Sequence, residues 1–145
     1  METAAVLAFA AGIAGAVQVA VMGRFGEEVG AIEALAFSLV LSTLIASVAL
    51  LAARGSIHGL ADAFHAPKWL WVGAVMGAFI VLTITIAAPR VGVVTVTALL
   101  IAGQLGTAVL IDRFGIFGVE RIALSWPRVV GIALLVAGAA LTLRR

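Results

Sequence analysis

The sequence predicts an all-α integral membrane protein, a bundle of five transmembrane helices in a single domain (1–145). Its 145 residues are 64% hydrophobic and only 11% charged, with a mean hydropathy of +1.27, whereas a soluble domain carries about 25% charged residues. A small soluble fold buries only about two-thirds of its chain surface, so this much apolar surface must face lipid. The apolar stretches are also long and are apolar on both faces, which excludes the alternating strands of a membrane barrel.

The first two predicted helices cover residues 3–23 and 31–53, since crossing a hydrocarbon core of roughly 30 Å takes about 20 helical residues. The first ends before the polar stretch 24–28, and the second ends before Arg54. The chain opens with Met1-Glu2-Thr3 and no basic residue, whereas a secretory signal begins with positive charge. We therefore expect the first apolar segment to be retained as a helix.

The third and fourth predicted helices cover residues 69–88 and 93–111. A polar loop, 54–68, precedes the third helix, which opens with two tryptophans typical of the membrane interface. We expect the stretch 89–92, with the sequence Pro-Arg-Val-Gly, to form a tight turn between the two helices.

The fifth predicted helix covers residues 127–143 and is the shortest, at the lower limit for crossing a bilayer. The stretch 116–124 before it mixes apolar residues with Glu120 and Arg121. It could lie along the interface, but we favour a loop.

Charge and composition exclude several function classes. The nine basic residues are dispersed, so no patch can follow a phosphate backbone, and we expect no nucleic-acid partner. Cysteine is absent, which excludes disulfides and thiolate chemistry. His58, His65 and Asp62 do not make a recognisable metal site. We also find no nucleophile–base pair and no phosphate loop, so we expect neither a cofactor nor enzymatic activity.

Small residues predict where helices approach closely. They occur in the first, third, fourth and fifth segments: Gly12, Gly15 and Ala16; Gly73 and Gly77; Gly103 and Thr107; Gly131 and Gly138.

The basic residues give no clear membrane orientation. With five crossings, one side holds Arg54, Lys68, Arg113, Arg121 and Arg128, and the other holds Arg24, Arg90, Arg144 and Arg145. Cytoplasmic loops normally carry a clear Lys/Arg excess, and five against four is not one. We therefore predict dual topology, with two copies, or this chain and an oppositely oriented relative, pairing as an antiparallel dimer. An odd number of helices, inverted and paired, is the inverted repeat of many secondary transporters. A single orientation remains the alternative.

Gln104 is the main candidate for a substrate pathway, because it lies near the middle of the fourth segment. Thr97 and Thr107 lie near the same face of that helix. An amide offers two donors and an acceptor, which suits a neutral or weakly charged solute. An interhelical hydrogen bond is the alternative role.

Gln18 and Glu33 are further candidates at similar depth near one membrane face. A carboxyl shielded from water could couple transport to protons, which is one interpretation of Glu33. The other, which we favour, is that Glu33 offsets the positive N-terminal end of the second helix. Hydroxyl side chains within the spans can bond to their own helix and are weaker candidates: Ser38, Ser42, Thr43, Ser47, Thr83 and Thr85. Asp112 and Arg113 suggest an interfacial stop with a local ion pair.

Several short motifs occur in order along nearly the whole chain: Gln18 with Arg24-Phe25-Gly26, Trp69-Leu70-Trp71-Val72-Gly73 with Gly77, Pro89-Arg90-Val91-Gly92, Ile101-Ala102-Gly103-Gln104 and Asp112-Arg113-Phe114-Gly115. In these the chain resembles the YdcZ-like family, short five-helix bacterial members of the drug/metabolite transporter (DMT) superfamily. The resemblance implies a multi-pass protein of the bacterial inner (cell) membrane with one DMT domain. It also implies a homodimer or a heterodimer, and it leaves the substrate unassigned.

Two positions depart from related patterns. Met22 stands where the resemblance implies an asparagine, so the end of the first helix loses a polar group. The first helix also lacks the mid-membrane glutamate of four-helix multidrug exporters, so their proton-coupled antiport is not implied here.

We therefore predict a secondary transporter, or a subunit of one, that moves a small solute by alternating access around Gln104 and Gln18. A small dual-topology ion channel and a noncatalytic membrane subunit of a larger complex are the alternatives.

Overall fold

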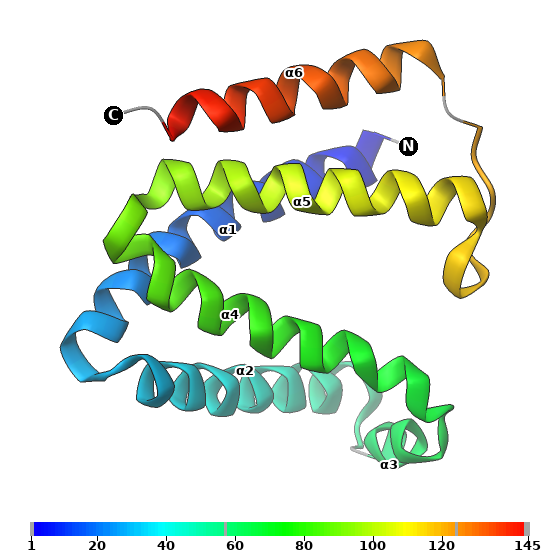
Figure 1. Cartoon of the computed structure of the whole chain (residues 1–145). Coiled ribbons are helices and arrows are strands. Elements are labelled where there is room, and N and C mark those ends of the chain that lie inside the picture. The colour runs from blue at the N-terminus through cyan, green and yellow to red at the C-terminus, as the bar shows by residue number, and fades with distance from the viewer. Residues whose placement is uncertain (1, 57, 124, 144–145) are drawn as a thin grey trace. The chain divides into compact units, whose positions relative to one another are not determined.

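The computed structural model describes residues 2–56, 58–123 and 125–143, and its regular structure is helical throughout. In chain order the elements are α1 (Glu2–Val29), α2 (Ala31–Arg54), α3 (His58–His65), the 3₁₀ helix η1 (Lys68–Trp71), α4 (Val72–Val91), α5 (Val93–Phe114), the 3₁₀ helix η2 (Ile116–Gly118) and α6 (Trp126–Thr142) (Figure 1). They form two compact units, one of residues 21–89 and one that joins residues 1–20 to residues 90–145.

Four helical stretches are long and apolar enough to cross a membrane: Glu2–Val29, Ala31–Arg54, Lys68–Val91 and Val93–Phe114. The fifth, α6, is apolar but has only 17 residues. The prediction of an all-α protein with helices that can span a membrane is therefore confirmed at this level. The count of five crossings stays a prediction, because it depends on α6.

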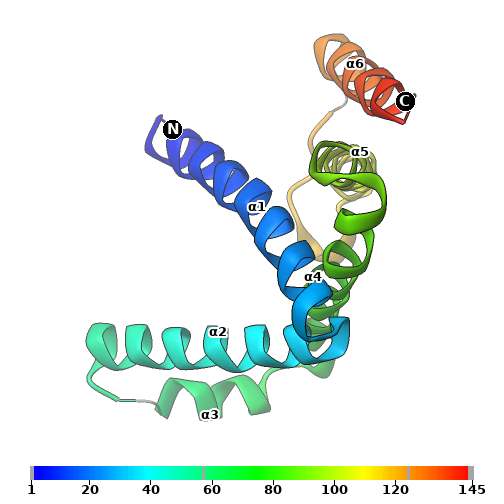
Figure 2. The ribbon, with the colours of Figure 1, turned by 90° about the vertical axis from the view of Figure 1, so that its left-hand side faces the viewer.

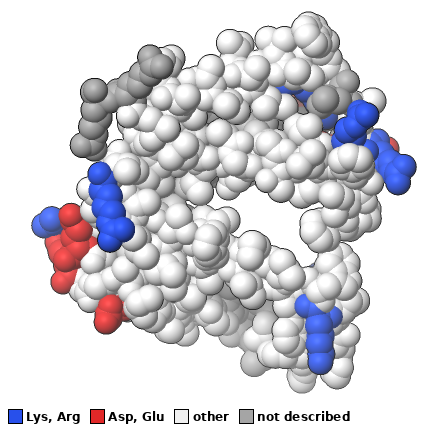
Figure 3. All heavy atoms as spheres, viewed as in Figure 1, with Lys and Arg blue, Asp and Glu red and all other residues white. Residues whose placement is uncertain are grey.

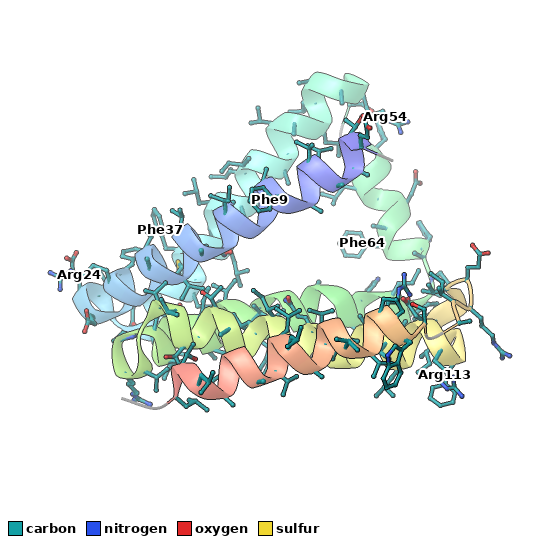
Figure 4. The ribbon with its side chains drawn as sticks, turned by 90° about the horizontal axis from the view of Figure 1, so that it is seen from above. Phe9, Arg24, Phe37, Arg54, Phe64 and Arg113 are labelled. Carbon is teal, nitrogen blue, oxygen red and sulfur yellow. The ribbon has the colours of Figure 1, made fainter. Side chains whose placement is uncertain are left out.

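In the four long apolar helices, charged side chains lie toward the ends and leave the centres uncharged. Residues 3–23, 34–53, 69–89 and 91–111 contain no Asp, Glu, Lys or Arg. Stretches of about 20 residues match the roughly 30 Å hydrocarbon core at 1.5 Å per residue. In Figure 3 the charged spheres sit at helix ends and the lengths between them are white, and in Figure 4 the labelled Arg24, Arg54 and Arg113 lie near such ends.

The first helix is longer than predicted, because α1 continues through the polar stretch 24–28 to Val29. Arg24 forms ion pairs with Glu27 (3.6 Å) and Glu28 (3.1 Å), which lie three and four residues further along the same helix. Arg and Glu are good helix formers, so charge ends the membrane span here without ending the helix. The helix stops only at Gly30.

The predicted tight turn at residues 89–92 is wrong, because α4 runs through Pro89 and ends at Val91. Proline removes one N–H donor and disfavours helical geometry at the residue before it, which suggested an end at Ala88. Pro89 removes only the one bond that its own nitrogen would donate to the carbonyl four residues earlier, so the helix can continue for two more residues. The helix is interrupted at Gly92, and α5 begins at the next residue.

Single glycines separate two pairs of consecutive helices. Gly30 (φ 103°, ψ 146°) stands between α1 and α2, and Gly92 (φ 88°, ψ 154°) stands between α4 and α5. Each glycine carbonyl accepts a hydrogen bond from the fourth residue onward, Ala34 (3.0 Å) and Val96 (3.1 Å) respectively. This backbone region is essentially restricted to glycine, so each change of direction depends on one residue without a side chain.

The sequence predicts that six hydroxyl side chains inside the spans can bond to their own helices, and four of the six do so. Thr43, Ser47, Thr83 and Thr85 each donate to the carbonyl four residues earlier, at 2.7–2.8 Å. Each of these polar groups is thereby satisfied without a partner from another helix.

The stretch 54–68, predicted as a polar loop, contains a short helix. Helix α2 ends at Arg54 and is followed by Gly55, which has left-handed geometry; residues 58–65 then form α3 and residues 68–71 form η1. The second stretch predicted as a loop, 116–124, contains η2 followed by irregular backbone; its last residue, Leu124, lies outside the described part of the chain.

Glycines of α1 pack closely against α4 within the unit of residues 21–89. A Cβ atom added at Gly23 would lie 2.8 Å from the Cβ of Ala88, and one added at Gly26 would collide with the Cγ2 of Thr85. Ala88 and Thr85 are both buried. Close backbone approach through small residues is a common way for membrane helices to associate, and it sets the α1–α4 contact here.

Candidate functional site

Helix α5 carries three of the five candidate pathway residues. At about 100° per residue, Thr97, Gln104 and Thr107 fall within an arc of about 80° around the helix. The side chains of Gln104 and Thr107 are exposed and make no hydrogen bond with the described residues. The structure thus presents the amide and one hydroxyl on the same open face of α5.

Thr97 differs from its two neighbours on this face. Its hydroxyl oxygen is buried and has no hydrogen-bond partner within the part of the chain that the structure describes. Many threonines in membrane helices bond to their own backbone, so an unpaired buried hydroxyl is unusual and carries a desolvation cost.

Helix α6 covers a different side of α5, and the two helices run antiparallel (Figures 1 and 2). Near the start of α5, the Thr95 hydroxyl donates to the carbonyl of Thr142 at the end of α6 (3.2 Å). Near the end of α5, Asp112 pairs with Arg128 in the first turn of α6, with 3.5 Å between Oδ2 and Nη1. The helix pair is therefore held at both ends by polar contacts.

The ion pair of Asp112 with Arg128 corrects the predicted local pair of Asp112 with Arg113. Adjacent residues on a helix point about 100° apart, so Asp112 can face α6 while Arg113 points elsewhere. The sequence indicated that Asp112 is interfacial, but it held no sign of which distant residue would face it.

A groove with a volume of about 350 Å³ runs between α5 and α6, and the Asp112–Arg128 pair lies in its wall. The other lining residues are apolar or small: Leu105, Ala108, Val109, Gly131, Ile132 and Leu135. Gln104 lies about 90° and Thr107 about 150° around α5 from the middle of this lining, by helix geometry. The groove and the Gln104 face are therefore two separate surfaces of one helix.

Gln18 lies on α1 with its side chain exposed and without a hydrogen bond to the described residues. It belongs to the unit formed by residues 1–20 and 90–145, whereas Glu33 belongs to the unit of residues 21–89. The position of Gln18 is therefore set by contacts in the first unit, and that of Glu33 by contacts in the second. Met22, where the resemblance implied an asparagine, is buried and gives α1 no polar group there.

Glu33 is the third residue of α2, and its carboxylate folds back toward the start of its own helix. A Cβ atom added at Gly30 would collide with the Glu33 Oε2 atom. An acid at this position meets the positive end of the helix dipole. The geometry favours the interpretation of Glu33 as a helix-end residue over a proton-coupling role.

No metal-binding group stands out among the described residues, where no three His, Asp or Glu side chains gather closely enough to hold an ion. His58, Asp62 and His65 all belong to α3.

The comparison with protein families gives one match. A family model described as "Putative inner membrane exporter, YdcZ" covers residues 3–141, which is nearly the whole chain. Comparisons with curated proteins and with solved structures found no match. The matched range includes all four long apolar helices and almost all of α6. The chain belongs to the YdcZ family of inner membrane exporters, and it is a multi-pass protein of the bacterial inner membrane.

Proposed function

We propose that this chain is half of a secondary transporter of the drug/metabolite transporter type, which pairs with an oppositely oriented copy or relative. The pair moves a small solute across the inner membrane by alternating access. The observation that carries the proposal is the family match over residues 3–141 to an exporter. Exporters are membrane transporters, and a transporter role fits a chain whose polar side chains within its spans are few.

Open glycine faces support the pairing. A Cβ atom added at Gly12, Gly15, Gly73, Gly77 or Gly103 would meet nothing within 4 Å in its own unit. These are positions where the sequence predicts close helix approach. In addition, only 6–11% of the most apolar part of each long helix is buried. A second chain and lipid together account for this uncovered surface.

The balance of basic residues also supports pairing in opposite orientations. Arg54, Lys68, Arg113, Arg121 and Arg128 would lie on one side and Arg24 and Arg90 on the other, where Arg144 and Arg145 join them if α6 crosses. That makes five basic residues against four. Arg144 and Arg145, which complete the second group, lie outside the described residues, as does Met1.

The substrate pathway in this proposal includes the Gln104 face of α5. The amide of Gln104 and the hydroxyl of Thr107 are exposed there, and the Thr97 hydroxyl has no partner. Polar groups at membrane depth are expensive unless they contact each other, a partner helix or a solute. We include Gln18 as a second amide contact and assign Glu33 to the start of α2.

Gln104→Ala tests this site. Purified protein in liposomes is screened for uptake of neutral, cationic and zwitterionic amines and amino acids, and the variant is then assayed with the solute that is carried. Loss of one solute hydrogen bond, worth about 1.4 kcal/mol, corresponds to roughly a tenfold drop in transport at low solute concentration. Leu99→Ala is the matched control, because Leu99 is on the same helix, is 45% exposed and lies about 140° around the helix from Gln104.

Three results would contradict the proposal at different levels. Equal transport by folded Gln104→Ala and unsubstituted protein would remove Gln104 from the pathway but leave the transporter intact. Unitary currents without saturable exchange would instead support the ion channel. If deletion of this protein lowers the abundance of a partner complex, and the reconstituted protein carries no solute, the result would support the alternative of a noncatalytic membrane subunit.

A further inference from the structure

Helix α3 (His58–His65) has two chemically distinct faces. By helix geometry, His58, Asp62 and His65 lie within an arc of about 60°, and Leu60 and Phe64 lie on the opposite side. No residue of α3 is buried. The helix is thus strongly amphipathic, unlike the long helices, which have apolar residues on all sides and few polar ones.

The apolar face of α3 continues onto η1. The ring of Phe64 packs edge-on against the ring of Trp71, with 6.0 Å between ring centroids and an interplanar angle of 88°. The Trp71 indole N–H also donates a hydrogen bond to the carbonyl of Ala63 (3.3 Å). These contacts fix α3 to the segment that leads into α4, so α3 and η1 form one local structure.

This joint apolar surface is uncovered in its unit. The exposed fractions are 51% for Leu60, 68% for Phe64 and 43% for Trp71, and Figure 4 shows the labelled Phe64 ring projecting from α3. Large apolar side chains gathered on one face of a polar segment mark a surface that contacts something other than water.

The position of α3 in the chain identifies what it contacts. It connects the end of α2 to the start of Lys68–Val91, and both of these helices are long and apolar enough to cross the membrane. The connection therefore emerges at the membrane surface, where Arg54 and Lys68 flank it. Tryptophan is enriched at this depth, and Trp69 and Trp71 stand at the start of the span.

We propose that α3 is an interfacial helix that lies along the membrane surface. Leu60, Phe64 and Trp71 insert between the lipid headgroups and the acyl chains, and His58, Asp62 and His65 face water. Amphipathic helices of this kind bury their apolar face about 5–10 Å into the boundary region. The lipid surface is the single partner that covers this face, and its contact with α3 sets the depth of the adjoining ends of α2 and α4.

Spin labelling tests the proposal in the complete chain, which contains no native cysteine. Single cysteines are placed at Leu60 and Phe64 on one face and at His58, Asp62 and His65 on the other. Each protein is labelled with a nitroxide and reconstituted in phosphatidylethanolamine–phosphatidylglycerol vesicles. Collision rates are then measured with oxygen, which concentrates in lipid, and with a water-soluble nickel chelate.

We expect a several-fold higher oxygen-to-nickel ratio at positions 60 and 64 than at 58, 62 and 65. Exclusion of both reagents at 60 and 64 would overturn the proposal in favour of protein contact, either with a second copy or within the chain. High nickel accessibility at all five positions would overturn it in favour of a hydrated loop. The polar-face variants control for misfolding, since they replace exposed side chains.

Discussion

Replacing Gly26 with valine is expected to lower the stability of the folded protein by about 1–3 kcal/mol, the usual cost of forcing extra side-chain atoms into a packed contact. Even one added methyl group at this position would collide with the Cγ2 of Thr85. Thr85 cannot easily move away, because it is 2% exposed and its hydroxyl is bonded to the carbonyl of Val81 at 2.7 Å. Helix α1 would have to separate from α4.

Gly106→Val is the matched control for this substitution. Gly106 is also a helical glycine, and an added Cβ there meets nothing within 4 Å in its unit. Surface changes of this kind usually alter stability by no more than about 0.5 kcal/mol. Unfolding by SDS in mixed micelles, followed by circular dichroism, measures both variants. Equal loss of stability in the two variants would show that the α1–α4 contact is not set by Gly26.

Replacing Gly92 with valine should also destabilise the protein strongly, but for a conformational reason. Gly92 has φ 88° and ψ 154°, a region that costs other residues on the order of 1–3 kcal/mol. A Cβ atom added there meets nothing within 4 Å, so steric crowding does not contribute. The chain would have to adopt another geometry between α4 and α5.

Gly106→Ala provides the control for Gly92, because it is a helical glycine of α5 that also has open space around it. Alanine favours helix over glycine by about 0.5–1 kcal/mol, so this variant should be as stable as the unsubstituted protein or more so. The same SDS titration compares the two. A Gly92→Val protein as stable as Gly106→Ala would contradict the proposed role of Gly92.

Helix positions were largely predictable, because lipid demands long uncharged stretches and these are visible in the sequence. The ends were less predictable where a helix continues past the membrane. Arg24, Glu27 and Glu28 end the apolar stretch but pair with each other along α1, so the helix continues. Pro89 similarly suggested an end that the chain reaches only at Gly92.

Contacts between distant residues were not predictable from one sequence. The ion pair of Asp112 with Arg128 and the bond from Thr95 to Thr142 depend on how α5 and α6 pack. The amphipathic pattern of α3 was present in the sequence. The prediction depended on long apolar segments, however, so a polar stretch of eight residues near Pro67 was interpreted as a loop. Its two-faced pattern was the signal that could have found it.

The candidate pathway residues remain predictions, and the structure changes how they are weighed. Gln104 and Thr107 share an open face of α5, and Thr97 adds an unpaired buried hydroxyl near that face. Glu33 folds toward Gly30 at the start of α2, which favours a local role for its carboxylate. Which groups complete the pathway depends on the second chain, because one chain supplies only half of the proposed transporter.

The paired-halves account depends on an odd number of membrane crossings, and α6 decides that number. Its uncharged part, residues 129–143, would span only about 22 Å at 1.5 Å per residue, shorter than the other spans. Arg128 at its start can extend toward the headgroups, and local thinning of the bilayer can accommodate the rest. A fifth crossing is therefore physically reasonable.

The most direct measurement places cysteines at both Thr3 and Leu143 in the same chain and labels intact spheroplasts with a membrane-impermeant maleimide, counting the labels on each molecule. In a protein of five crossings the two positions lie on opposite sides, so each molecule carries one label, and dual topology divides the labels about equally between Thr3 and Leu143. A protein with four crossings would carry two labels or none on each molecule, and that result would contradict the account of two inverted halves.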